Sequence, residues 1–582
     1  MAAGPVGGVI LGLHATGDCT GAALFRDGKL VGAVLEERLN RAKRTRSFPH
    51  QSIAWCLREA GLSSLDDVDT VTVAWNPAIP MSAINMSGFT NWRRYDPEFL
   101  YIVPNHLMGS MTGWDDSATT LGLGLQGDPR FVFVKHHLAH MGWAAASPFE
   151  QAALAVFDEH GEAKSSSFGT ITGNRIEVSH DISASHSLGT LYGTFTQYLG
   201  FRPYSEEWKV MGAAAYGDPA RFTPRLLEIV RCDDTGFRLD QNYFEFMNMR
   251  FAGYYGEALV QHLGIAPRAA GAPFEQCHFD LAAAVQTVFE SIAFTLLRRL
   301  NSLTGLRSLV LTGGCAMNSL ANGRIVANTP FDQVYIPQAP GDPGGCIGGP
   351  LWLLSQRAED SLFRADIPAC TGPDIDDEAV LATLTRCKIA YRRVDDPAAA
   401  AADLMATGHI IGWVQGRLEF GDRALGNRSI LADPRRAEMK DRINASVKYR
   451  ELFRPLAPAV LAEAAGTYFD HPPGLVVRHM ERVLQARPRA AEQIPAVIHA
   501  DGTGRVQMVT RQDNPLFHRL IESFRERTGV PVVLNTSFNV NGEPIVATAE
   551  DAIRTFFSSG IDALVIGSFV VEKTPGVTGG AW

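Results

Sequence analysis

The sequence contains the same succession of short apolar segments twice, at 9–36 and again at 152–185. In the first, VILGL and AALF flank a loop, and an Asp-Gly turn at 27–28 leads into LVGAVLEE. In the second, AALAVFD, a short loop, SSFGTIT, a Gly-Asn turn at 173–174 and RIEVSHD follow one another. Asp-Gly between apolar runs is a strong hairpin signal. The repetition predicts a duplicated α/β domain.

A third segment, RSLVLTGGCAMNSLANGRIV at 307–326, runs from a buried strand through a Gly-Gly turn into a helix. Backbone amides at such a turn, next to a helix N-terminus, can bind a phosphate or another oxyanion. A plain strand–helix connection that needs small residues for packing is the alternative. The segment predicts an oxyanion site but leaves this alternative open.

The chain of 582 residues is too long for one hydrophobic core, because domains average roughly 150 residues. Its composition shifts at 357–400, where charged residues and an Ala-rich run follow the helical and strand patterns. We expect the boundary at 360–375 and two domains, 1–365 and 366–582. The second contains the apolar strands HIIGWV, VPVVLN and ALVIGSFVV, which predict a separate α/β domain.

Composition excludes several classes of protein. The net charge of −9 argues against a global phosphate-binding surface, so anions must bind at local basic clusters and no nucleic acid is expected. The longest apolar runs are strand-length, which predicts no membrane span. The N-terminus has no Lys or Arg before Arg26 and resembles a first buried strand more than a signal peptide. Eight scattered cysteines without a CxxC pair fit a reduced, cytoplasmic protein.

The segment KHHLAHMGWAAA predicts a metal site. His136 and His140 are four residues apart on an expected helix, so their imidazoles share one face, while His137 points elsewhere. Asp158 ends an expected strand, and Asp342 lies in the Gly/Pro-rich loop APGDPGG. Two His and two Asp suit Fe(II), Zn(II) or Mn(II). A histidine pair at this spacing also arises by chance, and that alternative stays open.

A basic cluster occupies 416–455, with ten basic and six acidic residues between Arg417 and Arg454. Arginine forks bind phosphates and carboxylates in a bidentate manner, so the cluster predicts a polyanion site. A solvated charged helix explains 435–442, but not Arg417, Arg423 and Arg428, which lie among Gly, Phe, Leu and Ile. The scarcity of aromatic residues argues against nucleic-acid binding.

The segment VVLNTSFNVNGEPIV at 532–546 carries Asn535, Ser537 and Asn539 after an apolar strand. Ligands of open α/β sheets usually bind at this end of the strands. The Asn-Gly pair at 541–542 indicates a turn. A ligand site and simple turn chemistry explain the segment equally well.

Taken together, these motifs resemble the NodU/CmcH carbamoyltransferase family, whose members O-carbamoylate antibiotics such as tobramycin and nodulation factors. The resemblance spans nearly the whole chain. It rests on EERLNRAKRTRSFP (36–49), HHLAH (136–140), EWKVMGAAAYGDP (207–219), LTGGCAMNS (311–319), APGDPGG (339–345), GRLEFGDRALGNRSIL (416–431), VKYRELFRPLAP (447–458) and LNTSFNVNGEPIV (534–546).

The resemblance implies a fold and a reaction. The N-terminal domain would have a duplicated actin/hexokinase-like (ASKHA) ATPase fold, and a YrdC-like α/β domain would follow it. The C-terminal domain would convert carbamoyl phosphate and ATP, with Mg(II), into carbamoyl-adenylate. The N-terminal domain would hold Fe(II) or another divalent transition metal and transfer the carbamoyl group to a hydroxyl or amine of a small-molecule acceptor, antibiotic or sugar-like. A homodimer is common for such enzymes.

The resemblance also assigns residues to roles. The metal ligands would be His136, His140, Asp158 and Asp342. Lys209, Gly313, Gly314 and Asn318 would surround the nucleotide in the N-terminal domain. In the C-terminal domain Arg417 and Lys448 would be catalytic, and the substrate-binding residues would be Arg423, Arg428, Ser429, Arg450, Arg454, Asn535, Ser537 and Asn539.

One position departs from the family pattern. The first hairpin loop carries Gly17 where the family usually has His, so His14 would act as the acceptor base or Asp18 would orient the acceptor. Neither the acceptor nor the choice between O- and N-carbamoylation can be read from the sequence. The loop 77–126 is expected to form the acceptor pocket.

Two other functions remain possible from the sequence. A small-molecule kinase or ATPase of the same fold would release ADP and would leave the C-terminal Arg cluster without a role. A non-catalytic binding or regulatory subunit would have lost its site residues, whereas both His, both Asp and the Arg set are present.

Overall fold

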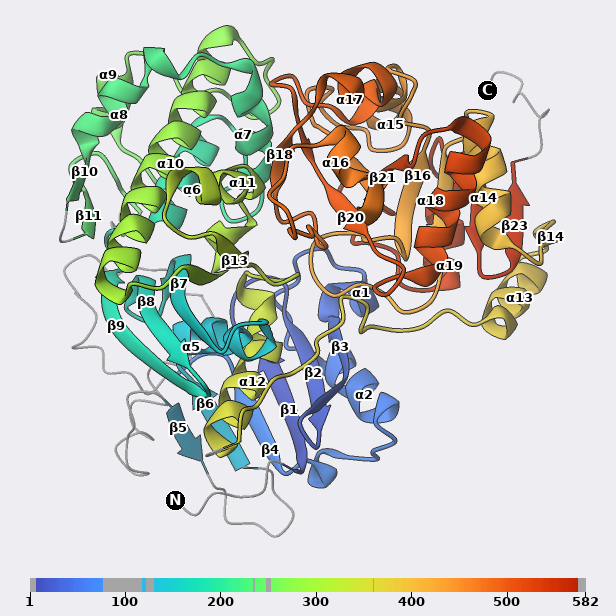
Figure 1. The fold of residues 1–582 in the computed structure, drawn as a ribbon, viewed down its shortest axis with the longest axis horizontal. Helices are drawn as coiled ribbons and strands as arrows, with labels where there is room; N and C mark the ends of the chain where they lie inside the picture. The colour runs from blue at the N-terminus through green and yellow to red at the C-terminus, as the bar shows by residue number, and fades with distance from the viewer. Residues whose placement is uncertain are drawn as a thin grey trace. The chain divides into compact units, whose positions relative to one another are not determined.

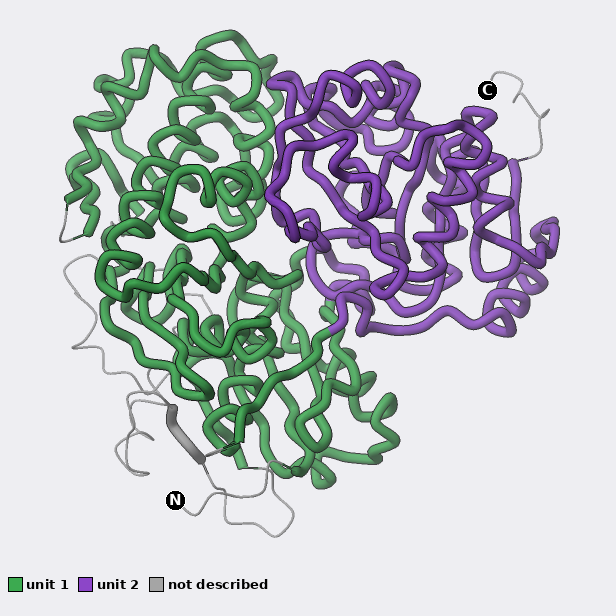
Figure 2. The backbone as a smooth tube through the Cα atoms, in the orientation of Figure 1, with its two compact units in different colours: residues 1–36, 44–367 green, residues 37–43, 368–582 purple. Residues whose placement is uncertain are grey.

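The computed structural model describes residues 7–76, 118–121, 130–233, 236–246, 253–358 and 361–573. The chain forms two compact units (Figures 1 and 2). The first comprises residues 1–36 with 44–367, and the second comprises residues 37–43 with 368–582. The second unit therefore includes a short segment from the N-terminal part of the chain. The expected acceptor-pocket loop lies almost entirely outside the described residues.

The first unit contains two sheets with the same strand order. In the first sheet the order is β3-β2-β1-β4-β6-β5. The strands β1, β2 and β3 are antiparallel, and β4 and β6 then run parallel to β1. Their bounds are β1 Val9–His14, β2 Gly21–Arg26, β3 Lys29–Leu35, β4 Thr70–Val73, β5 Ala118–Leu121 and β6 Arg130–Val134.

The second sheet repeats this order as β9-β8-β7-β12-β13, again with three antiparallel strands followed by two parallel ones. The predicted duplication is thereby confirmed. The bounds are β7 Gln151–Gly161, β8 Lys164–Thr172, β9 Arg175–Ser183, β12 Ser308–Thr312 and β13 Gln333–Tyr335. One detail differs from the expectation. The strand β7 does not end at Asp158 but continues through an irregularity in its pairing with β8 to Gly161.

The last parallel strand of each repeat leads to a helix, and these two helices pack on each other. The helix α5 (His136–Gly142) follows β6, and α12 (Gly345–Arg357) follows β13. Their backbones are in direct contact: a Cβ added to Gly348 would lie 1.9 Å from the Ala139 carbonyl oxygen. On β1, a Cβ at Gly12 would lie 1.9 Å from the carbonyl oxygen of Cys346 in α12. Glycine is therefore required where α12 meets α5 and β1.

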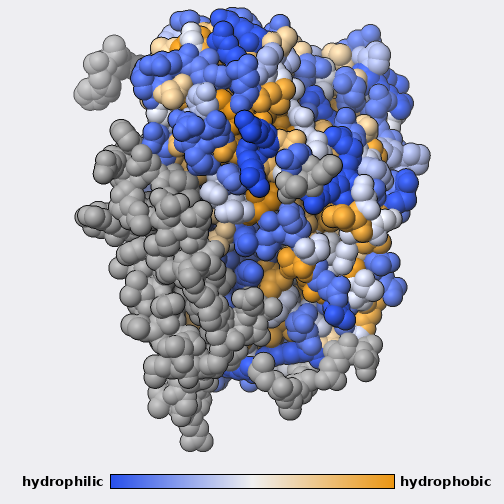
Figure 3. Space-filling model, turned by 90° about the vertical axis from the view of Figure 1, so that its left-hand side faces the viewer, coloured by the Kyte–Doolittle hydropathy of each residue, from blue (hydrophilic) through white to orange (hydrophobic). Residues whose placement is uncertain are grey.

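Among the described residues of the first unit, one helix is long and apolar enough to cross a membrane by length and composition. This is α10 (Gln276–Thr304), and 83% of its most apolar window is buried inside the structure. Burial of this kind is typical of a core helix. In the view of Figure 3 the described surface is mainly hydrophilic, with hydrophobic residues scattered over it.

The second unit is built on a mixed eight-stranded sheet in the order β14-β23-β22-β15-β16-β21-β17-β20. The predicted strands HIIGWV, VPVVLN and ALVIGSFVV lie in it, but the last is a hairpin that turns at Gly567 with φ +51. The bounds are β14 Arg392–Arg393, β15 Ile411–Val414, β16 Arg428–Ala432, β17 Ala457–Leu461, β20 Gln507–Val509, β21 Val532–Ser537, β22 Ala563–Ile566 and β23 Phe569–Glu572. A separate pair, β18 (Val483–Gln485) and β19 (Thr503–Arg505), is antiparallel.

Both faces of this large sheet are covered, which explains why its central strands are apolar throughout. Successive residues of β21 alternate between two cores: Val532 and Leu534 face one, and Val533 faces the other. The helices α14 (Pro397–Ala406) and α18 (Pro515–Thr528) cover the second core. The first core includes residues of α13 (Asp377–Arg386), α15 (Met439–Ser446) and α19 (Ala549–Phe557).

The glycine contact between α5 and α12 can be tested by adding one methyl group. Gly348→Ala should lower the melting temperature of the first unit by about 5 °C or more, because its Cβ would overlap a backbone oxygen. The matched control is Gly349→Ala in the same helix, whose Cβ would lie 3.3 Å from the Thr72 hydroxyl. Equal melting temperatures of the two variants in differential scanning calorimetry would contradict this packing.

Candidate functional site

The structure brings together the four side chains of the predicted metal site. One ligand atom from each of His136, His140, Asp158 and Asp342 lies within 4.8 Å of all the others. The Asp158 carboxylate lies 3.2 Å from Nε2 of both histidines, and the two Nε2 atoms are 3.2 Å apart. The Asp342 carboxylate lies 3.5 Å from His136 Nε2 and 3.7 Å from His140 Nε2. Two imidazole nitrogens and two carboxylates fit a divalent transition metal.

The candidate ligands lie at corresponding positions of the two repeats: α5 corresponds to α12, and β7 corresponds to β1. The histidines lie on α5 after the last strand of the first repeat, and Asp342 lies just before α12 after the last strand of the second. Asp158 lies on the first strand of the second repeat, and His14 ends the first strand of the first. The close packing of α5 on α12 therefore brings the ligands together.

Backbone contacts fix the orientation of His136. Its Nδ1 lies 3.0 Å from the Ala74 carbonyl oxygen, which requires the proton on Nδ1 and directs the Nε2 lone pair to the ligand group. The Glu162 carboxylate accepts hydrogen bonds from the backbone N–H groups of His136 and Asn76, at 2.9 and 2.8 Å. As predicted, His137 is not part of the ligand group; its Nδ1 lies 2.6 Å from the Ser167 hydroxyl.

The charges of the four groups balance when no metal is bound. Burial alone would lower the pKa of His136, but the Asp342 and Asp158 carboxylates outweigh it and hold that pKa well above its usual value. The pKa of His140 is also raised, because its contacts with both carboxylates outweigh burial. Burial would raise the pKa values of Asp158 and Asp342, yet the histidines hold both below the usual range.

His14 lies within electrostatic reach of this group. It is buried, its Nε2 lies 3.2 Å from the Asp18 carbonyl oxygen, and its Nδ1 has no hydrogen-bond partner among the described residues. Burial lowers its pKa more than Asp342 raises it, so His14 is neutral at pH 7. The Asp18 carboxylate pairs with Arg46 and lies 3.8 Å from Arg44 Nε.

The Gly-Gly turn differs from the expected open oxyanion site. Gly313 has φ +90, and a Cβ there would lie 2.2 Å from the Phe157 carbonyl oxygen, so glycine is required. The Gly314 N–H donates to the Asp158 carboxylate at 3.1 Å and thus orients a candidate metal ligand. Asn318 caps the helix α11 (Ser319–Asn328) and exchanges two hydrogen bonds with Gln286. Lys209 pairs with Glu206 at 2.7 Å.

In the second unit, Lys448 of the basic segment 416–455 binds residues of the segment 532–546. Its ammonium donates to the Asn539 side-chain and backbone oxygens at 2.8 and 2.9 Å and to the Ser537 carbonyl oxygen at 2.5 Å. Burial, together with the charges of Arg450 and Lys43, holds the pKa of Lys448 well below its usual value.

Four arginines lie near the buried Lys448: Arg454 is buried, and Arg423, Arg450 and Arg505 are half-buried. Burial and the charges of Arg423, Arg450 and Arg454 hold the pKa of Arg505 well below its usual value. Burial and Arg454 lower the pKa of Arg450 to about 9. Glu451 pairs with Arg454 at 3.3 Å, but positive charge predominates in this cluster. A bound polyanion would relieve the repulsion, so the arrangement is suited to phosphates.

Four predicted site residues make hydrogen bonds within the second unit. The Arg428 guanidinium is fully buried and donates to the carbonyl oxygens of Gln415, Gly416, Asn427 and Pro373. The buried Ser429 hydroxyl accepts from the Gly426 N–H at 3.1 Å, and the buried Asn535 amide donates to Gln507 and Ala424. Arg417 donates to the Thr371 carbonyl oxygen at 2.8 Å.

Sequence reasoning missed Arg505 and Lys43 as members of the basic cluster. Arg505 ends the short strand β19, outside the motifs that we singled out. Lys43 lies in EERLNRAKRTRSFP, which carries part of the resemblance, but its distance from Lys448 along the chain hid their proximity.

Comparison with known proteins decides the family. The family model Carbamoyltransferase N-terminus matches residues 9–351, and Carbamoyltransferase C-terminus matches residues 402–573. The chain belongs to the NodU/CmcH carbamoyltransferase family. It is an enzyme, a carbamoyltransferase.

Three relatives illustrate the range of this carbamoyltransferase family. Nodulation protein NolNO of Sinorhizobium fredii is 37% identical over 565 residues, covering 95% of this chain and 78% of that protein. Nodulation protein NolO of Bradyrhizobium diazoefficiens is 38% identical over 448 residues, covering 76% and 79%. The 3'-hydroxymethylcephem-O-carbamoyltransferase of Streptomyces clavuligerus is 29% identical over 392 residues, covering 66% and 68%.

Metal binding by the carbamoyltransferase should release protons at pH 7. His136 and His140 have raised pKa values in the metal-free protein, and imidazole binds a metal only when neutral. The affinity for Mn(II) or Co(II) should therefore increase as the pH rises. Calorimetric titration in two buffers of different ionisation enthalpy counts the protons released. His140→Ala should lose binding and His137→Ala should keep it; equal loss in both would contradict the four-residue assignment.

The same shifts predict how stability depends on pH. A histidine whose pKa is raised by folding stabilises the protein fully below the unfolded value of about 6.5. This contribution is lost as the pH rises through the folded-state pKa. Metal-free enzyme should therefore melt at lower temperature as the pH rises above neutrality, and added metal should reverse the loss. A melting temperature that rises with pH over this range would contradict the ion pairs.

Proposed function

We propose that this enzyme makes carbamoyl-adenylate in its second unit and transfers the carbamoyl group to a small-molecule natural product at the ligand group of the first. The first step would consume carbamoyl phosphate, ATP and one water and would release phosphate and pyrophosphate. The second would form a bond from the carbamoyl carbon to an acceptor oxygen or nitrogen and would release AMP. The observation that carries the proposal is the cluster of arginines around the buried Lys448.

The cluster supplies what two phosphorylated substrates need. Arg423, Arg450, Arg454 and Arg505 would neutralise the phosphates of ATP, bound with Mg(II), and of carbamoyl phosphate. Fixed positive charge in a region shielded from water stabilises the additional charge that develops on a leaving phosphate. The Lys448 ammonium is held by oxygens of Ser537 and Asn539, so its position is set before the substrates bind. This YrdC-like role is proposed for the whole second unit.

In the first unit, His136, His140, Asp158 and Asp342 would hold Fe(II) or another divalent transition metal. Such a metal supplies Lewis-acid polarisation of a carbonyl or phosphoryl oxygen. His14 is the group best placed to accept a proton from the acceptor hydroxyl, because it is neutral at pH 7 and its Nδ1 has no partner among the described residues. Arg46 and Arg44 hold the Asp18 carboxylate at the same hairpin loop, where it would orient the acceptor.

The two steps can be separated by measuring nucleotide products without an acceptor. Enzyme incubated with ATP, carbamoyl phosphate and Mg(II) should release pyrophosphate. Lys448→Ala and Arg505→Ala should each lower that rate about a hundredfold or more, because each removes a positioned donor group next to the phosphates. His140→Ala should keep pyrophosphate release, because it lies in the first unit.

The control for these variants is Arg442→Ala, which removes an exposed arginine paired with Asp562 and should leave the rate unchanged. Production of ADP and phosphate independent of carbamoyl phosphate would contradict adenylate formation. A wild-type rate in both Lys448→Ala and Arg505→Ala would place the reaction elsewhere.

A further inference from the structure

The segment 37–43 belongs to the second unit although the residues on both sides of it belong to the first (Figure 2). It overlaps the helix α1 (Glu36–Asn40) and carries Arg38, Arg41 and Lys43. Arg38 donates to the Gly421 carbonyl oxygen at 2.8 Å, two residues before Arg423 of the basic cluster. A segment from the start of the chain thus contacts a loop of the proposed adenylate-forming unit.

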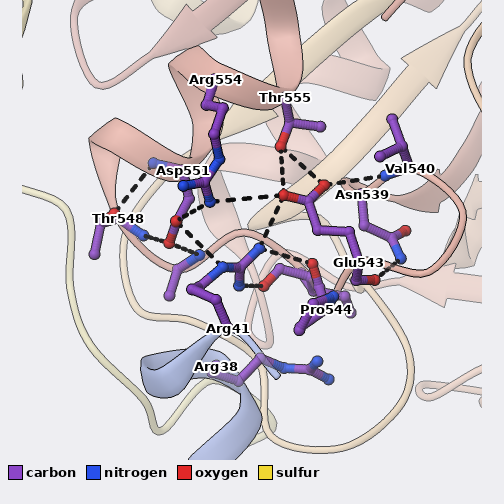
Figure 4. A network of polar contacts seen from close by, with 12 residues as sticks. Arg38, Arg41, Asn539, Val540, Glu543, Pro544, Thr548, Asp551, Arg554 and Thr555 are labelled. Carbon is purple, nitrogen blue, oxygen red and sulfur yellow. Dashed lines mark hydrogen bonds and ion pairs between the residues drawn. The ribbon is translucent and has the colours of Figure 1, made fainter. Parts of the chain in front are cut away.

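Arg41 makes the most extensive of these contacts (Figure 4). Its guanidinium donates to the carbonyl oxygens of Ile545 at 2.6 Å and Pro544 at 3.0 Å. It also pairs with the carboxylates of Glu543 and Asp551, each at 3.2 Å. Four oxygen atoms, three from residues 543–545 and one from Asp551 in the first turn of α19, therefore surround one side chain.

Glu543 connects Arg41 to the proposed catalytic lysine. Its carboxylate accepts from the Thr555 hydroxyl at 2.9 Å and from the Val540 N–H at 3.2 Å. Its backbone carbonyl oxygen accepts from the Asn539 amide at 2.6 Å. The side-chain oxygen of the same Asn539 accepts from the Lys448 ammonium. The contacts thus run without a break from Arg41 through Glu543 and Asn539 to Lys448.

The charge of Arg41 points to a positioning role. Two carboxylates surround its guanidinium, so it adds little to the positive potential of the basic cluster. Asp551 is already bound by Arg554 and by the cap of α19, and Glu543 by Thr555. What Arg41 adds is a bridge between the two carboxylates and the two carbonyl oxygens.

We propose that Arg41 is a positioning residue for carbamoyl-adenylate formation: it fixes the loop 543–545, which orients Asn539 and through it the Lys448 ammonium. This inference rests on the proposed function of the second unit. The functional second unit would then be discontinuous in sequence, because the side chain that orients Asn539 and Lys448 lies outside residues 368–582. A displacement of about 1 Å at a reacting group can lower a rate by as much as a hundredfold.

The test measures pyrophosphate release by the full chain. Arg41→Gln should lower kcat by about tenfold to a hundredfold. The KM values for ATP and carbamoyl phosphate should change much less, because the cluster keeps its charge. Arg41→Lys should recover part of kcat, and added guanidinium should restore activity to Arg41→Ala. The matched control is Arg527→Gln, which removes an arginine bound to Asp403 and to the Ser523 carbonyl oxygen in the same unit.

Two results would overturn the proposal. One is a kcat within twofold of wild type in both Arg41→Gln and Arg41→Lys. The other is a loss of activity that merely follows a loss of folded protein, with a lowered melting temperature and no rescue by guanidinium. If Arg41→Gln does not fold, Arg41→Lys carries the test and must show reduced kcat at a wild-type melting temperature. Absence of pyrophosphate from wild-type enzyme would instead refute the proposed function, which separates the two failures.

Discussion

The direct contact of glycine backbones between α12, α5 and β1 is the constraint on which the first unit depends. Gly12, Gly142 and Gly348 leave no room for a Cβ, so the three elements approach as closely as main chains allow. The short distance places Asp342, at the start of α12, against the histidines of α5. Because packed interiors shift rather than compress, a wider spacing here would separate the ligand atoms directly.

The two units handle buried charge in opposite ways. In the first, two imidazoles face two carboxylates, so the group is electrically balanced with protons in place of a metal. In the second, arginines and a lysine repel each other, although Glu451 pairs with Arg454 at 3.3 Å. Uncompensated buried charge costs free energy that a bound anion recovers.

Local patterns in the sequence predicted the repeated hairpins of the first unit and the residues of its ligand group. The repeated hairpins and the spacing of His136 and His140 follow from strand and helix periodicity, which a sequence displays directly. The roles of arginines could not be predicted in this way. Arg428 and Arg450 lie in the same basic stretch, yet carbonyl oxygens surround the first while the second faces other cations. Composition cannot distinguish an arginine that binds backbone oxygens from one whose neighbours are other cations.

Contacts between distant parts of the chain were equally hidden from the sequence, and one of them bears on how the protein is made. Arg41 and Ile545 are 504 residues apart. At about 5–20 residues per second, a ribosome needs roughly 25–100 s between them. During that time the strands β1, β2 and β3 can pair with one another, but the residues that bind the Arg41 side chain have not yet been synthesised. The loop 543–545 and the first turn of α19 must then fold against a segment that was synthesised about five hundred residues earlier.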